Sequence, residues 1–177
     1  MLGMRLLVAS LSMLFAASIV GYVVIRSRSA IWPPAGSPPL PGGLWLSTVL
    51  LLISSGTMCA ATMAARRDAQ RQLRVGLLLT TLLGVGFLAS QTANWSALVA
   101  RHLTPGLNLF GFTFFLLTGL HAAHVVGGLV PLSVVTVRAW KGRYSAAFHP
   151  GVRYCALYWH FLDVVWVILF GVVFLAG

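Results

Sequence analysis

Charged residues are scarce in this chain, and acidic ones are nearly absent. Of its 177 residues only 8% are charged and two are acidic, whereas 59% are hydrophobic. A soluble domain carries about 25% charged residues. A soluble domain of this size also cannot bury so much apolar surface, because too much of it would remain facing water. The composition therefore predicts a membrane protein and excludes soluble enzymes and disordered regulators.

Cysteine is also scarce, with only Cys59 and Cys155 in the whole chain. The two are far apart in sequence, form no CxxC pair and have no histidine or cysteine neighbour at ligand spacing. This pattern argues against a zinc site or a disulfide. We expect both cysteines to be small, buried apolar residues.

Basic residues outnumber acidic ones and give a formal net charge of +10. They occur in short clusters between long uncharged runs. Nucleic-acid binding requires a continuous basic face, whereas clustered cations beside apolar runs are typical of membrane topology signals. Nucleic acid is therefore not an expected partner.

Long apolar runs are what the chain has in abundance. A helix needs about 20 mainly apolar residues to cross a bilayer, and five segments reach that length. The first has Arg5 before it, as a secretory signal peptide would, but its apolar run is long and Arg26 and Arg28 follow directly, so we expect a retained helix. The sequence predicts an all-α polytopic bundle in one transmembrane domain, 1–177, with spans at about 6–25, 44–65, 75–100, 107–137 and 154–176.

The distribution of Lys and Arg between the two sides predicts the orientation of the bundle. Nine of these residues fall on the side of the amino terminus and three on the other. Because cytoplasmic loops carry the excess of Lys and Arg, we expect the amino terminus inside and the carboxyl terminus outside.

Four ionisable residues interrupt the predicted spans. His121 and His124 lie in the fourth span, and His160 and Asp163 lie in the fifth. Such side chains are costly in lipid and almost always face protein or a water-filled cavity, which makes each a functional candidate. The two histidines of the fourth span project about 60° apart on a helix. We expect all four residues to face protein as one polar cluster.

Two tryptophans belong to the same face as the acid of this cluster. In the fifth span Trp159, Asp163 and Trp166 form one stripe at helical spacing, and His160 borders it. A separate stripe in the fourth span, Gly119, Ala123 and Gly127, has the small-xxx-small spacing that lets another helix approach closely.

Several roles fit the polar cluster on residues alone. It can hold helices in register by interhelical hydrogen bonds. A histidine from each helix could ligate haem, the acid and histidines could relay protons, or three histidines and one aspartate could bind a metal. Hydrolytic chemistry lacks support, because the spans show no Ser-His-Asp arrangement and their single acid cannot form a carboxylate pair.

Two C-terminal motifs carry a resemblance to a known family. The run LTGLHAAHVVGGL (117–129) and the run YWHFLDVVW (158–166) closely resemble the last two helices of subunit III of haem-copper oxygen reductases. Weaker similarity in 44–57 and 86–95 extends the match over nearly the whole chain. Together the two C-terminal motifs are highly specific.

The resemblance implies a five-helix form of that fold and a role as a non-catalytic subunit of a terminal respiratory oxidase, such as a cytochrome c oxidase of a bacterial inner membrane. It implies oxidase subunits I and II as partners, haem and copper in those partners, no cofactor or metal in this chain, and phospholipid between its helices. It assigns no catalytic residue. The residues that match the family motifs, and that we expect to serve packing, lipid or partner contacts, are His121, His124, Trp159, His160, Asp163 and Trp166.

Three positions depart from the family pattern. Leu11, Asn94 and Arg153 stand where the family often has an acid, so proton handling through those carboxylates is not expected here. These departures leave two related alternatives open, an accessory protein of a nitric oxide reductase and the third subunit of a quinol oxidase. A free-standing di-histidine membrane cytochrome is a more distant alternative.

The cluster hypothesis predicts that Asp163→Leu impairs stability or assembly, because it removes the only acid within the spans. The thermal unfolding midpoint in detergent and the amount of assembled complex measure this effect. A variant with normal stability and assembly would contradict the hypothesis.

Overall fold

The computed structural model describes residues 2–34 and 36–175, and this part of the chain is helical and without strands. Five helices are long and apolar enough to cross a membrane, which confirms the predicted fold class. A π-helical turn, Gly171–Leu175, directly continues the last of them. The helices are α1 (Leu2–Ser27), α2 (Gly43–Arg66), α3 (Gln70–Ala100), α4 (Leu109–Trp140) and α5 (Pro150–Phe170).

The helices run a few residues past the apolar segments, into the polar residues that flank them. At two helix starts the sequence has a residue that is typical of that position. Asn108 precedes α4, and its side chain accepts a hydrogen bond from the Gly111 amide at 2.7 Å, as an N-cap does. Pro150 begins α5, where a missing N–H is harmless. The predicted end of the fifth span, Ala176, lies outside the described residues.

Buried positions recur every three and then four residues along the helices. A repeat of 3.5 residues keeps one seam of a helix facing its neighbour and is typical of left-handed helix packing. In α5 and the π-helical turn that continues it, the seam is Val152, Cys155, Trp159, Leu162, Trp166, Leu169 and Val173. In α3 it is Leu73, Leu77, Thr80, Gly84, Phe87, Gln91, Asn94 and Leu98.

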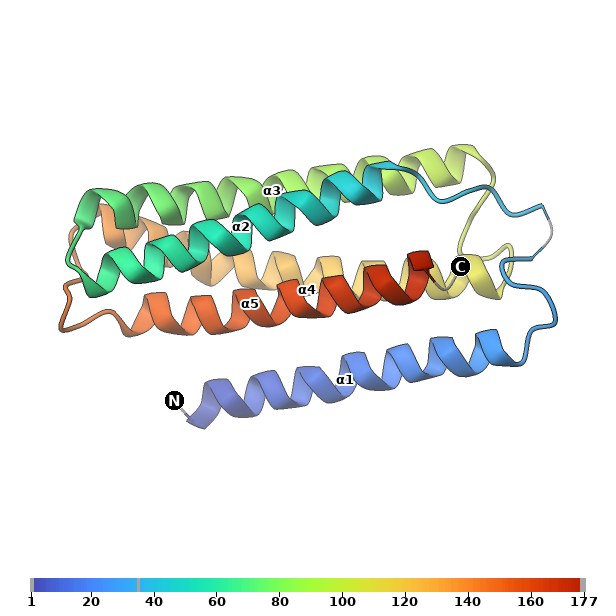
Figure 1. Ribbon diagram of the computed structural model, residues 1–177, viewed down its shortest axis with the longest axis horizontal. Helices are drawn as coiled ribbons and strands as arrows, with labels where there is room; N and C mark the ends of the chain where they lie inside the picture. The colour runs from blue at the N-terminus through green and yellow to red at the C-terminus, as the bar shows by residue number, and fades with distance from the viewer. Residues whose placement is uncertain (1, 35, 176–177) are drawn as a thin grey trace.

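Four helices form the body of the bundle, and α1 lies beside it (Figure 1). α2 and α3 run side by side as an antiparallel pair, and their neighbours are α4 and α5. α1 packs mainly against α4 and α5 and buries two residues, Phe15 and Tyr22. α1 begins and α5 ends at opposite ends of the bundle (Figure 1), as an odd number of crossings requires. Which end is inside stays a prediction.

Glycines in α3 and α4 permit the closest helix approaches. A Cβ built on Gly76 would lie 2.9 Å from the Cβ of Ala61 and 3.2 Å from its backbone. A Cβ on Gly84 would lie 2.7 Å from the Trp159 ring. In α4 the close approach is at Gly128, against Tyr158. The Gly119–Ala123–Gly127 stripe makes no such approach within the chain, because nothing lies within 4 Å of a Cβ on Gly119. Its close approach to another helix stays a prediction.

The contact at Gly76 predicts that Gly76→Ala destabilises the protein by about 1–3 kcal/mol, because α2 and α3 must move apart. Gly56→Ala is the matched control, since a Cβ there meets nothing within 4 Å and alanine favours the helix by about 1 kcal/mol. Thermal unfolding in detergent compares the two. Equal stabilisation of both variants would show that α2 and α3 tolerate a wider separation.

Candidate functional site

The stripe of α5 that the sequence singled out packs onto α2 through side-chain hydrogen bonds. The Trp159 indole N–H donates to the Ser54 hydroxyl at 2.8 Å, and the Trp166 indole N–H donates to the Thr48 hydroxyl at 3.1 Å. As α5 advances by seven residues, its partner on α2 retreats by six, as antiparallel helices require. Both indoles are almost fully buried, so each buried N–H has the partner that it needs.

His160, the residue after Trp159 in α5, also contacts α2. Its Nδ1 lies 2.9 Å from Ser55 Oγ and 3.6 Å from Asp163 Oδ2, and its Nε2 lies 3.5 Å from Cys59 Sγ. The hydrogen bond of Nδ1 is therefore the one to the Ser55 hydroxyl, and the Asp163 carboxylate lies beyond hydrogen-bond distance. The His160 side chain is 34% exposed and that of Asp163 is 7% exposed. Cys59 was expected to be buried and to have no histidine neighbour. Both expectations are wrong, because this thiol is exposed and contacts His160. Cys155 is buried as expected.

His121 occupies the centre of the bundle and is completely buried. Its ring lies 5.1 Å from that of Trp166, 5.7 Å from that of Phe87 and 6.2 Å from that of Phe15. Residues of α1, α3 and α5 therefore surround one imidazole of α4. Within the part of the chain that the structure describes, neither ring nitrogen has a hydrogen-bond partner. Its contacts are those of an aromatic core residue.

His124 lies one turn away and is partly exposed. Its Nδ1 lies 2.7 Å from the Leu120 carbonyl of the same helix. Because a carbonyl only accepts, Nδ1 carries the proton. The Phe15 ring packs edge-on against the imidazole at 5.1 Å, and the Tyr158 hydroxyl donates to the His124 carbonyl at 3.2 Å.

The six predicted residues thus lie on facing helices but form different contacts. Among residues 2–34 and 36–175, no hydrogen bond or ion pair joins the histidines of α4 to His160 or Asp163. Aromatic contact through Trp166 links the two groups instead. The role of these residues in lipid or partner contacts stays a prediction.

His121 and His160 do not have the surroundings of haem ligands. Aromatic rings already occupy the space around His121, and both nitrogens of His160 face side chains of its own chain. The described residues also contain no set of three His, Cys, Asp or Glu side chains that could hold a metal ion. The proposed arrangement of three histidines and one aspartate around a metal therefore does not form in this part of the chain.

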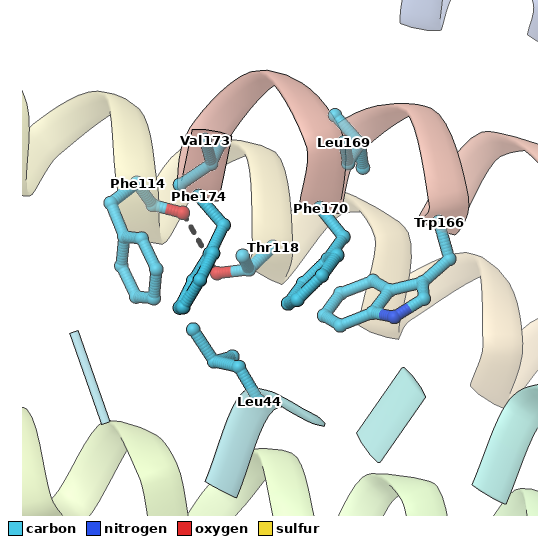
Figure 2. A pocket seen from close by; sticks show the side chains of 8 residues that line it. All are labelled: Leu44, Phe114, Thr118, Trp166, Leu169, Phe170, Val173 and Phe174. Carbon is cyan, nitrogen blue, oxygen red and sulfur yellow. Dashed lines mark hydrogen bonds between the residues drawn. The ribbon is translucent and has the colours of Figure 1, made fainter. Parts of the chain in front are cut away.

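A small cavity lies beside Trp166, between α5, α4 and the start of α2 (Figure 2). Its volume is about 10 Å³, which is barely the space of one water molecule. Thr118 is the one hydroxyl in its lining, and that hydroxyl already bonds to the Phe114 carbonyl and to the Trp95 indole N–H. The cavity is too small and too apolar for a cofactor. Its other lining residues are Leu44, Leu169, Phe170, Val173 and Phe174.

Sequence reasoning missed the polar pairs between α2 and α3. Ser47 lies 2.9 Å from Ser90 and accepts from the Asn94 amide at 3.2 Å. Thr57 and Thr80 form a similar hydroxyl pair at 2.8 Å. Their signal was present, since Ser47, Thr80 and Asn94 all fall on the buried 3.5-residue seams. Asn94, one of the departures from the family pattern, is thus an interior link.

The fold and these contacts define a class of protein. Five membrane-length helices pair many of their buried polar groups with one another and expose large apolar side chains along their outer faces. This is a multi-pass membrane protein whose core is built for helix packing.

Comparison with known proteins identifies the family. A family model described as cytochrome c oxidase subunit III matches residues 1–177. Subunit 3 of cytochrome c oxidase from Synechocystis sp. is 37% identical over 182 aligned residues, which cover 99% of this chain and 75% of the relative. The corresponding subunit of Thermostichus vulcanus is 31% identical, covering 98% and 86%. Subunit 3 of the cytochrome bo(3) ubiquinol oxidase of Pseudomonas aeruginosa is 34% identical, covering 93% and 78%.

The chain belongs to the cytochrome c oxidase subunit III family, which confirms the resemblance carried by the motifs in 117–129 and 158–166.

The α2–α5 contacts predict that Ser54→Ala lowers the free energy of unfolding by about 0.6–2 kcal/mol, the range of interhelical hydrogen bonds in membranes. The change leaves the buried Trp159 N–H without its acceptor. Ser12→Ala is the control, because Ser12 is exposed and bonds only to the Val8 carbonyl of its own helix. A chemical unfolding titration in mixed micelles measures both. If Ser54→Ala is as neutral as the control, the indole bond is not a significant link.

Proposed function

We propose that the chain is the non-catalytic third subunit of a terminal haem-copper oxidase in a bacterial inner membrane. It packs against the catalytic subunit I, in a complex that includes subunit II, and it binds phospholipid between its helices. Haem and copper belong to the partner subunits. The role of this chain is to stabilise the catalytic subunit.

The observation that carries the proposal is the filled interior of the bundle. His121 lies among aromatic rings, the indoles of α5 bond to hydroxyls of α2, and the cavity beside Trp166 has a volume of about 10 Å³. Among the described residues, the contacts around His121, Trp159 and Trp166 leave no space for a substrate at the centre of the bundle, so we expect activity on a substrate to reside in a partner. Family membership supports the identity of that partner.

The outer surface supports assembly. α1 fully buries only Phe15 and Tyr22 against the bundle, and many of its other large apolar side chains are exposed. A helix so weakly attached to its own chain is better held where a neighbouring subunit or lipid covers its outer face.

Two electron donors fit the proposal, because the relatives include subunits of both a cytochrome c oxidase and a ubiquinol oxidase. An accessory protein of a nitric oxide reductase is the second candidate. The observation that favours it is that Leu11, Asn94 and Arg153 stand where the family often has an acid.

We expect an affinity-tagged chain, extracted in mild detergent, to bring with it a catalytic subunit that contains both haem and copper. Visible spectra and metal analysis of the purified complex measure this. Haem and non-haem iron without copper would instead indicate a nitric oxide reductase. A Soret band that stays with this polypeptide after it is separated from all partners would contradict the proposal.

A further inference from the structure

A groove between α2 and α5 opens at the end of the bundle where α2 ends and α5 begins. It encloses about 370 Å³. The groove lies outside the indole–hydroxyl contacts and the cavity described above. It is lined by Cys59, Thr62, Met63, Arg66, Arg153, Ala156 and His160.

The register of α2 and α5 places the residues that line the groove at two depths along the helix axes. Cys59 and His160 touch across the helices at 3.5 Å and form the deeper level. Arg66 lies seven residues beyond Cys59, and Arg153 lies seven residues before His160. Seven residues are about two turns, or about 10.5 Å, on the same helix face. Because the helices are antiparallel, both arginines lie at the mouth of the groove, one on each side.

The charge of these two arginines is not balanced by the chain. Both side chains are exposed. The chain has two acidic residues: Asp68 accepts a hydrogen bond from the Gln70 side chain, and Asp163 faces His160. The structure describes no ion pair between either arginine and a carboxylate. Two guanidinium groups beside one opening therefore form a site for an anion, and a guanidinium binds phosphate oxygens in a bidentate manner.

The walls of the groove beyond the two arginines differ in character from its charged mouth. Thr62, Met63 and Ala156 separate the mouth from the Cys59–His160 pair. Met63 and Ala156 give this level an apolar surface, beside the hydroxyl, thiol and imidazole groups of Thr62, Cys59 and His160, and Met63 is exposed on the outer face of α2. A ligand with an anionic head and apolar tails fits both levels, whereas a free anion would use only the mouth.

We propose that Arg66 and Arg153 bind the phosphate of one anionic phospholipid, whose ester region and upper acyl chains lie against Met63, Ala156 and His160. The proposal rests on the phospholipid binding included in the proposed function and assigns it a place and a headgroup charge. An arginine near the membrane surface contributes about 1 kcal/mol to the attraction of anionic lipid, which is about fivefold in affinity.

The test measures lipid retention by the purified complex. Native mass spectrometry of the detergent-solubilised complex counts bound lipids after addition of phosphatidylglycerol or phosphatidylcholine. We expect wild type to retain phosphatidylglycerol preferentially. Arg66→Gln and Arg153→Gln should each weaken this binding about fivefold, and the double variant should weaken it further. Arg66→Lys with Arg153→Lys should keep most of the preference, because the charge is retained.

The matched control is the double variant Arg28→Gln with Arg101→Gln. It removes the same charge from the opposite end of the bundle, and phosphatidylglycerol binding should be unchanged. Equal binding by wild type and the Arg66/Arg153 variant overturns the proposal. So does displacement of the lipid by millimolar inorganic phosphate, which indicates a site for a free anion. Loss of a partner subunit with unchanged lipid overturns it as well, because the arginines then bind an acidic protein segment.

The outcomes separate this inference from the proposed function. If the chain brings no oxidase partner but still binds phosphatidylglycerol through Arg66 and Arg153, the proposed function fails and the lipid site stands. If the oxidase complex is recovered and the arginine variants bind lipid as wild type does, the lipid site fails and the proposed function stands.

Discussion

The structure depends on the need of polar groups in a membrane to find partners within protein. In the bilayer core there is no water, and lipid tails cannot form hydrogen bonds. An indole N–H or a hydroxyl without a protein partner is therefore costly there. Here Trp159 and Trp166 donate to Ser54 and Thr48, and hydroxyl pairs join α2 to α3. These bonds fix which residues of adjacent helices are level with one another. The apolar seams then pack in the one register that the polar pairs allow.

The packing around this network supports the proposed role, in which the bundle stabilises a catalytic partner. Small residues bring α2 and α3 together, and the rings around His121 connect four helices through one imidazole. A core filled in this way resists rearrangement, because close-packed interiors transmit small displacements instead of absorbing them. A rigid neighbour of this kind limits the motions of a larger catalytic partner that it contacts, which is how it can stabilise that partner.

The sequence was sufficient for the number of helices, because apolar length is a strong and local signal, and for the family, because the motifs in 117–129 and 158–166 are specific. It also placed Trp159, Asp163 and Trp166 on one face. It could not show which helix that face meets, since the partner of a stripe is decided by tertiary packing. For the same reason it could not show that Gly128, and not the Gly119–Ala123–Gly127 stripe, makes the close contact of α4 with α5. Cys59 was misjudged because its neighbour His160 is distant in sequence.

The side chain of Asn94 fills the space above Gly43, against which a Cβ at position 43 would clash directly with its amide oxygen. Positions 43 and 94 therefore share one volume, although they are 51 residues apart in the sequence. A larger side chain at position 43 would displace the Asn94 amide, and with it the hydrogen bond to Ser47, or shift the start of α2. The glycine that begins α2 is thus a condition for the amide link between α2 and α3.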